Sequence, residues 1–367
     1  MGGIEGFFSS QLQAMEASAR FVASDGSVVL CDGRIDNLDE LRRAHGPANG
    51  DALEVLHATW RAHGDDFASR VIGDFAIAIW DPARCRLLLT RDPFGIRPLF
   101  HAQDGDRFVF ASRIRTIVEA THVPLDVDEE FIAEYLAFPR LSDRTPFRAI
   151  RAVAPGHVVV ADANGVTSRR WWSLARAPEV RLGSDVEYEQ AFRELFFEAV
   201  RARLDVDGTA FAELSGGLDS SSIVCVADRL LAERRCRATS LETISYVFDE
   251  SSASDERFFI GAVEHRRGRR GVHLREEDHR IFSSLPDEMF LEYPTPIQLF
   301  GGRGDAVLSA MESAGARVLL RGTAGDQVLW GESNVAWEIG DLVAQSRWRE
   351  LRERLRVWSL ATRKPYL

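Results

Sequence analysis

The stretch that decides the fold is Glu213-Leu214-Ser215-Gly216-Gly217-Leu218-Asp219-Ser220-Ser221-Ser222. The apolar run 209–214 leads into it and the amphipathic run 221–234 leads out, which predicts a strand, a glycine loop and the start of a helix. Unpaired N–H groups in the first turn of a helix bind anions, and two glycines let the backbone approach a phosphate group. We therefore predict a nucleotide-binding loop. The alternative is a glycine turn with a serine N-cap, which accounts for Ser-Gly-Gly alone.

A second glycine-rich turn follows the apolar run 317–320 and has the sequence Arg321-Gly322-Thr323-Ala324-Gly325-Asp326-Gln327. The carboxyl ends of parallel strands meet at one edge of a sheet, so Asp219 and Asp326 are expected to face one crevice. Both are candidate catalytic carboxylates and Mg²⁺ ligands for polyphosphate chemistry. Taken alone, the second turn is equally compatible with a plain turn followed by a helix cap.

The chain is expected to divide near residue 180. Short strands and few helices precede this point, a pattern typical of an α+β domain, and the polar segment 175–185 is predicted to be a linker. Beyond it helices and strands alternate, which predicts a doubly wound α/β domain. Its predicted elements are helix 186–204, strand 209–214, helix 221–234, strand 243–248, helix 255–266, strand 272–274, helix 304–315, strand 317–320 and helix 341–358.

Composition narrows the function classes. The 367 residues carry a net charge of −11, which argues against a general nucleic-acid partner. No apolar run approaches the ~20 residues that cross a bilayer, and none resembles a signal peptide, so we expect no membrane partner and a cytoplasmic location. The four cysteines form no C-x-x-C pair, and we expect them to be reduced and to bind no zinc.

The loop 215–221 resembles that of the ATP pyrophosphatases, which transfer AMP to a carboxylate and release pyrophosphate. Together with the turn that follows Gly322, it is similar to asparagine synthetase. Stretches of the first domain strengthen this resemblance, namely 31–37, 73–81 and 91–100. The resemblance implies an αββα sandwich of the Ntn-hydrolase type, a class II glutamine amidotransferase-like domain, over residues 1–178. It implies a parallel-sheet ATP-pyrophosphatase domain over 186–367 that is short at its C-terminus.

The resemblance also implies ATP and Mg²⁺ as cofactors and assigns site residues. It implies that adenosine is bound by Leu214, Phe248, Arg321 and Gly322. Pyrophosphate would be bound by the loop residues Ser215, Gly216, Gly217, Leu218, Asp219 and Ser220. Mg²⁺ would be bound by Asp219 and Asp326. Arg91 and Asp92 are expected to be structural rather than catalytic.

Two departures from the family pattern concern the first domain. Gly2 stands where the family's glutaminase has its nucleophilic cysteine, and glycine has no side chain that can attack glutamine. Asp32-Gly33 stands where the family has an oxyanion-stabilising Asn-Gly, and a carboxylate repels the developing oxyanion. The sequence therefore predicts a glutamine amidotransferase domain without glutaminase activity.

Three functional hypotheses follow. The first is a synthetase that adenylates a carboxylate and joins it to an amine of the same molecule, with lasso-peptide macrolactam formation favoured over other ring closures. Its partners are a small-molecule or precursor-peptide carboxylate and a complementing protein chain. The second is a glutamine-hydrolysing asparagine synthase. The third is an ATP-binding pseudoenzyme or half of a split synthetase, suggested by Lys364, the only lysine, which does not match the family's catalytic lysine.

Overall fold

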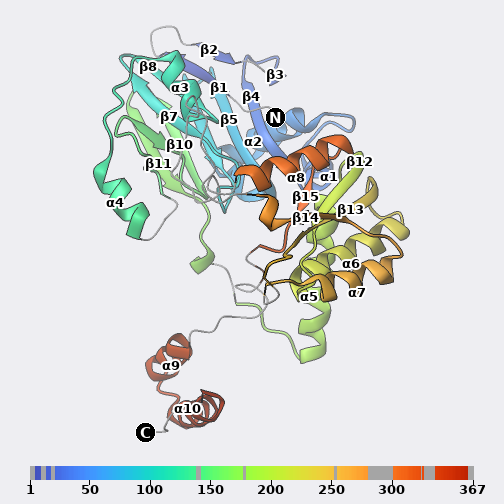
Figure 1. The fold of residues 1–367 in the computed structure, drawn as a ribbon. Coiled ribbons are helices and arrows are strands. Elements are labelled where there is room, and N and C mark those ends of the chain that lie inside the picture. Colours follow the sequence, from blue (N-terminus) through green and yellow to red (C-terminus); the bar gives the residue numbers. More distant parts are fainter. Residues whose placement is uncertain are drawn as a thin grey trace. The chain divides into compact units, whose positions relative to one another are not determined.

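The computed structural model describes residues 5–9, 14–17, 21–137, 142–176, 179–251, 254–279, 301–323, 325 and 335–362. These residues form two compact units, one holding the described residues up to Gly183 and the other beginning at Ser184 (Figure 1). None of the helices in these ranges is both long and apolar enough to cross a membrane.

The first unit contains two antiparallel sheets. The larger has the order β11-β10-β6-β5-β4-β3. Its strands are β3 (Phe21–Val22), β4 (Val28–Ile35), β5 (Gly73–Asp81), β6 (Arg86–Arg91), β10 (His157–Asp162) and β11 (Gly165–Arg170). The smaller has the order β2-β1-β8-β7-β9. Its strands are β1 (Glu5–Ser9), β2 (Ala14–Ala17), β7 (Phe100–Asp104), β8 (Arg107–Ala111) and β9 (Ile150–Ala152).

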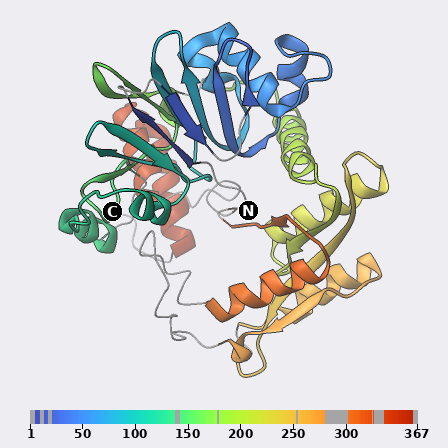
Figure 2. The ribbon, with the colours of Figure 1, turned by 90° about the horizontal axis from the view of Figure 1, so that it is seen from above.

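Alternating side chains build the layers of this unit. Leu30 and Ala78 face the second sheet and share a core with Phe110, whereas Ile77 and Ile79 face the other way. On that outer face the larger sheet packs against α1 (Leu38–Ala44) and α2 (Ala52–His63), as Figure 2 shows. Helix α3 (Ile114–Ala120) packs on the outer face of the smaller sheet. The order helix–sheet–sheet–helix confirms the predicted αββα sandwich.

The loop that follows β6 is held by a buried arginine and a buried aspartate. The Asp92 carboxylate accepts hydrogen bonds from the amides of Phe94, Ile96 and Arg97 at 3.0–3.1 Å. Arg91 donates to carbonyl oxygens of the same loop and, at 2.9 Å, to that of Val153. Both charged groups therefore fix backbone, in agreement with the structural role that the sequence suggested.

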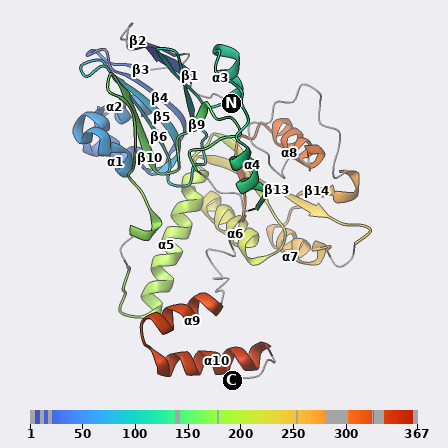
Figure 3. The same ribbon diagram turned by 90° about the vertical axis from the view of Figure 1, so that its left-hand side faces the viewer.

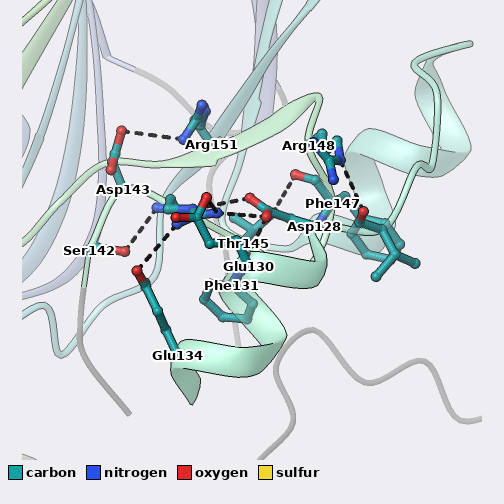
Figure 4. A network of polar contacts seen from close by, with 12 residues as sticks. Asp128, Glu130, Phe131, Glu134, Ser142, Asp143, Thr145, Phe147, Arg148 and Arg151 are labelled. Atoms are coloured by element: carbon teal, nitrogen blue, oxygen red, sulfur yellow. Dashed lines mark hydrogen bonds and ion pairs between the residues drawn. The ribbon is translucent and has the colours of Figure 1, made fainter. Parts of the chain in front are cut away.

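A polar network anchors α4 (Glu129–Ala137) (Figure 4). Asp128 caps the helix by accepting a hydrogen bond from the amide of Phe131 at 3.2 Å. The Arg144 guanidinium bonds to Asp128 and Glu130, and Thr145 donates to the carbonyl of Ile150 at 2.8 Å. The network thus joins the start of α4 to the segment that leads into β9.

The second unit is built on a parallel sheet with the order β14-β13-β12-β15. Its strands are β12 (Gly208–Glu213), β13 (Ala238–Val247), β14 (Val272–Arg275) and β15 (Leu319–Leu320). Helices α5 (Asp185–Arg203), α6 (Leu218–Ala232) and α7 (Arg257–Arg267) share a core with one face. Helix α8 (Gly301–Ser313) covers the other face (Figure 3). This arrangement confirms the predicted doubly wound sheet.

The C-terminal helical run differs from the prediction of a single helix over 341–358. The structure has α9 (Val335–Ala344) and α10 (Trp348–Thr362), joined by an ion pair between Glu338 and Arg354 at 2.9 Å. The break is a helix C-cap in which Ser346 takes a φ of +56° and the amide of Arg347 donates to the carbonyl of Leu342. Glycine usually marks this turn, and its absence from 341–358 hid the break.

Replacing Asp128 by asparagine tests the anchoring of α4. The hydrogen bond from Arg144 is the largest cause that lowers the pKa of Asp128 in the folded protein. The Asp128 carboxylate therefore stabilises the fold fully above its unfolded-state pKa of ~4, and this stabilisation is lost as the pH falls through the lower folded-state pKa. We expect Asp128→Asn to cost about 0.5–2 kcal/mol at pH 7. The difference from wild type should shrink below pH ~4.

Scanning calorimetry of the full chain between pH 2.5 and 7 measures this effect. Asp106→Asn is the matched control, because Asp106 is exposed and makes no hydrogen bond or ion pair within the described residues. A pH-independent difference for Asp128→Asn would contradict the assigned role.

Candidate functional site

The predicted loop lies between β12 and α6, as the sequence suggested. Leu214 is 1% exposed and its amide donates to the carbonyl of Ile244 at 2.8 Å, which extends the sheet to the edge of the loop. Gly216 has a φ of +84°, and Gly217 is the N-cap of α6. No side chain in the described part of the chain caps this helix, so the amides of its first turn are open to an anion.

Two serine hydroxyls close the loop on itself. Ser220 Oγ accepts a hydrogen bond from the Ser215 amide at 3.1 Å and lies 3.0 Å from Ser215 Oγ. Ser215 Oγ in turn accepts from the amide of Gly217 at 3.3 Å. The Ser221 hydroxyl is buried and has no hydrogen-bond partner within the described residues. The contacts of Ser215 and Ser220 hold the loop in shape.

Glycines allow three backbone segments to meet here. A Cβ at Gly216 would collide with Phe259 and lie 2.8 Å from the backbone nitrogen of Ile260 in α7. A Cβ at Gly322 would lie 3.1 Å from the Ser220 nitrogen, and one at Gly325 would collide with the Asp219 carboxylate. The second glycine turn therefore abuts the first, as predicted. Asp326, the second predicted Mg²⁺ ligand, lies outside the described residues.

The two turns border a cavity of about 510 Å³. Its lining includes the predicted residues Leu214, Ser215, Gly217, Leu218, Asp219, Ser220 and Gly322. It also includes Glu213, Tyr246, Glu256 and Thr323. Gly216 lies behind the loop against α7, and Phe248 follows β13 with its carbonyl bonded to Arg257. Most of the lining therefore consists of residues predicted from the sequence to bind the nucleotide, whereas Glu213, Tyr246 and Glu256 were not among them.

Glu213 links the ends of three strands. Its Oε1 accepts a hydrogen bond from the Tyr246 hydroxyl at 2.8 Å, and its Oε2 accepts from Arg321 Nε at 2.9 Å. Burial, with the charge of Glu213, raises the pKa of Tyr246, so the phenol stays protonated and acts as a donor. Glu213 is the one charged residue in the otherwise apolar run 209–214, and this could have marked it as a candidate site residue.

The donor set suits a nucleotide polyphosphate with Mg²⁺. The Asp219 carboxylate lines the cavity and has no hydrogen-bond or ion-pair partner in the described part of the chain. Mg²⁺ usually takes one or two protein carboxylates and completes its shell with phosphate oxygens and water. Within the described ranges no cluster of three His, Cys, Asp or Glu side chains could hold a metal without such a ligand. Asp219 beside the open helix amides fits this mode of binding.

Asp32 is a buried carboxylate in the first unit. Its side chain is buried, accepts a hydrogen bond from Ser112 Oγ at 3.2 Å and lies 3.7 Å from Arg97 Nη1. Gly33 has a φ of +133°, and a Cβ there would collide with the Asp74 carbonyl oxygen. The residue predicted to stand at the family's Asn-Gly position is thus a buried carboxylate held by Ser112 and Arg97. Gly2 lies outside the described residues.

Comparison with known families covers both units. A family model described as a glutamine amidotransferase domain matches residues 12–172, and one described as asparagine synthase matches residues 191–365. The chain belongs to the asparagine synthetase family. The loop 215–220 and the cavity that it borders lie in the part matched by the asparagine synthase model.

Individual curated proteins are also similar to this chain. Asparagine synthetase [glutamine-hydrolyzing] 1 of Bacillus subtilis is 30% identical over 62% of this chain and 35% of its own length. Asparagine synthetase [glutamine-hydrolyzing] 3 of the same organism is 29% identical over 55% and 34%. Amidase chyE of Penicillium rubens is 26% identical over 75% and 42%. The chain spans less than half the length of these relatives.

Adding a methyl group at Gly216 tests the geometry of the loop. Alanine at this φ, pressed against α7, should destabilise the second unit by on the order of 1–3 kcal/mol. Gly261→Ala in α7 is the matched control, because a Cβ at this position would meet nothing within 4 Å. This substitution should stabilise the helix by about 0.5–1 kcal/mol.

Urea unfolding of both variants gives the comparison. Equal and small effects at the two positions would show that the loop does not take the described conformation.

Proposed function

We propose that this chain binds Mg-ATP in the cavity of the second unit and activates a carboxylate as an acyl-adenylate for amide formation. The observation that carries the proposal is the uncapped start of α6 beside the free carboxylate of Asp219. Membership of the asparagine synthetase family supports the reaction class. In this reaction the carboxylate attacks the α-phosphorus, pyrophosphate leaves, and an amine then displaces AMP.

The described residues fall into separate roles. The open amides of α6 and the hydroxyls of Ser215 and Ser220 would hold the pyrophosphate portion. Asp219 would hold Mg²⁺, which when bound offsets the negative charge of the phosphates. Leu214 and Gly322 would border the adenosine, as their place in the lining allows. Helix amides and hydroxyls fixed in advance lose little freedom when the ligand binds.

The amine is proposed to come from a source other than glutamine. Gly2 offers no nucleophile, and Asp32 offers a buried carboxylate where an oxyanion would need a donor. Because Arg97 and Ser112 stabilise this carboxylate, it is part of the folded unit rather than an unpaired charge. We therefore favour an amine within the substrate itself, with lasso-peptide macrolactam formation as the specific hypothesis. Thr323 in the lining, where asparagine synthetase has glutamate, supports a changed substrate.

Two other functions remain as alternatives. Glutamine hydrolysis is favoured by the match of residues 12–172 to the glutamine amidotransferase model. An ATP-binding pseudoenzyme, or half of a split synthetase, is favoured by the single lysine, Lys364. The first requires ammonia release from glutamine by the purified chain. The second requires ATP binding without any acid-dependent exchange.

ATP–pyrophosphate exchange tests the proposed reaction. The purified chain with Mg²⁺ is offered aspartate, candidate peptides with a free carboxylate, and glutamine. We expect exchange that depends on one acid, and no release of ammonia from glutamine. ATP binding without exchange for any acid in the panel would instead support the pseudoenzyme or split synthetase.

Replacing Asp219 by asparagine tests the placement of the nucleotide. Losing a charged ligand to Mg²⁺ should weaken Mg-ATP binding by about tenfold to a hundredfold, measured by calorimetry. Asp305→Asn is the matched control, because Asp305 is exposed on α8 and has no polar partner within the described residues. Unchanged affinity in Asp219→Asn would move the nucleotide away from this cavity.

A further inference from the structure

The nucleotide cavity poses a problem of charge. Its described lining contains three carboxylates, Glu213, Asp219 and Glu256, and no lysine or arginine. ATP is itself strongly anionic, and adenylation adds negative charge at the α-phosphate as the acyl oxygen bonds to phosphorus. Mg²⁺ at Asp219 offsets part of this charge. A fixed cation near the α-phosphate would offset more of it.

Arg321 does not line the cavity itself but is bonded to Glu213, which does, and it can supply that cation. It follows β15 directly, and its neighbour Gly322 abuts Ser220 and Asp219 of the phosphate loop. Its Nε donates to Glu213 Oε2 at 2.9 Å, which is its one hydrogen bond within the described residues. Its two Nη groups have no hydrogen-bond partner among the described residues, and the side chain is 47% exposed. An arginine held by Nε still offers two donors that match the oxygens of a phosphate.

Glu213 fixes the direction of this guanidinium. It ends the strand that lies between β13 and β15, and its side chain is only 16% exposed. Tyr246 holds the second carboxylate oxygen at 2.8 Å, so Glu213 is restrained from both sides. The Tyr246 ring is covered by Arg303, whose guanidinium carbon lies 4.6 Å from the ring centroid and which bonds to Glu276 at 2.9 Å. A continuous chain of side-chain contacts therefore leads from Arg303 in α8 through Tyr246 and Glu213 to Arg321.

We propose that Arg321 binds the α-phosphate of ATP and that Glu213 is the positioning residue that directs it there. This inference rests on the proposed adenylation. The amides of α6 and the serines of the loop take the terminal phosphates, which leaves the α-phosphate for a group on the neighbouring strand end. During the reaction the acid oxygen bonds to the α-phosphorus, the bond to the bridging oxygen breaks, and its electron pair leaves with pyrophosphate. Arg321 donates hydrogen bonds to the α-phosphate oxygens throughout.

Calorimetry with four ligands separates this role from others. The ligands are ATP, AMP, adenosine and pyrophosphate, each with Mg²⁺, and the variants are Arg321→Gln, Arg321→Lys and Glu213→Gln. We expect Arg321→Gln to weaken ATP and AMP by about tenfold to a hundredfold and to change adenosine and pyrophosphate by less than about twofold. Arg321→Lys should lose less affinity than Arg321→Gln, because lysine keeps the positive charge but lacks the paired N–H donors of a guanidinium.

A double variant tests the link between the two residues. If Glu213 acts through Arg321, Glu213→Gln should weaken AMP binding, and adding it to Arg321→Gln should cause little further loss. Glu233→Gln is the control, because Glu233 lies at the far end of α6 and pairs with Arg229 and Arg235. It should leave all four affinities unchanged. Thermal unfolding of each variant identifies any that fails to fold.

Other outcomes would overturn the inference. Equal weakening of adenosine and AMP would assign Arg321 to the nucleoside, and loss of pyrophosphate binding would assign it to the terminal phosphates. Additive losses in the double variant would remove the positioning role of Glu213. If wild type binds neither ATP nor AMP, the proposed function fails and the inference with it. If wild type binds both and Arg321→Gln binds them equally well, only the inference fails.

Discussion

The close approach of backbone at three glycines is the constraint on which the candidate site depends. Gly216 presses the phosphate loop against α7, whereas Gly322 and Gly325 press the second turn against the first. Any larger residue would force these segments apart, and the amides at the start of α6 would lose the walls of their cavity. The parallel sheet makes this meeting possible, because β12 and β15 are neighbours whose carboxyl ends open at one edge. Glycine at the same few positions is therefore needed both for the stability of the second unit and for the shape of the site.

The first unit has the fold of a glutamine amidotransferase domain, and its loss of glutaminase activity is a proposal. The αββα sandwich keeps the buried Arg91 and Asp92 that shape a loop by holding backbone. Asp32, which we propose stands where an amide would stabilise an oxyanion, is held by Ser112 and Arg97. Fold alone therefore does not decide what the first unit does.

The sequence predicted those parts of the structure that local patterns encode. The alternation of helices and strands and the Ser-Gly-Gly-Leu-Asp-Ser loop predicted the parallel sheet of the second unit and most of the cavity lining, whereas the two-sheet sandwich was implied by the family resemblance. The ion pair of Glu213 with Arg321 could not be predicted, because 108 positions separate the two residues and only the sheet order joins them. The C-cap at Ser346 was missed because a non-glycine residue takes the left-handed turn. The place of Asp326 stays a prediction.

Hydrogen–deuterium exchange with and without Mg-ATP tests the central claim most directly, because it reports on the loop amides without requiring the acid substrate. Binding at the start of α6 should slow exchange in residues 215–221, where amides would donate to phosphate, and in the turn at 322–323 that borders the same cavity. Exchange in the αββα sandwich should be unchanged at its core strands. If saturating Mg-ATP left exchange in 215–221 unchanged, or slowed exchange in the sandwich instead, Mg-ATP would not bind at the start of α6.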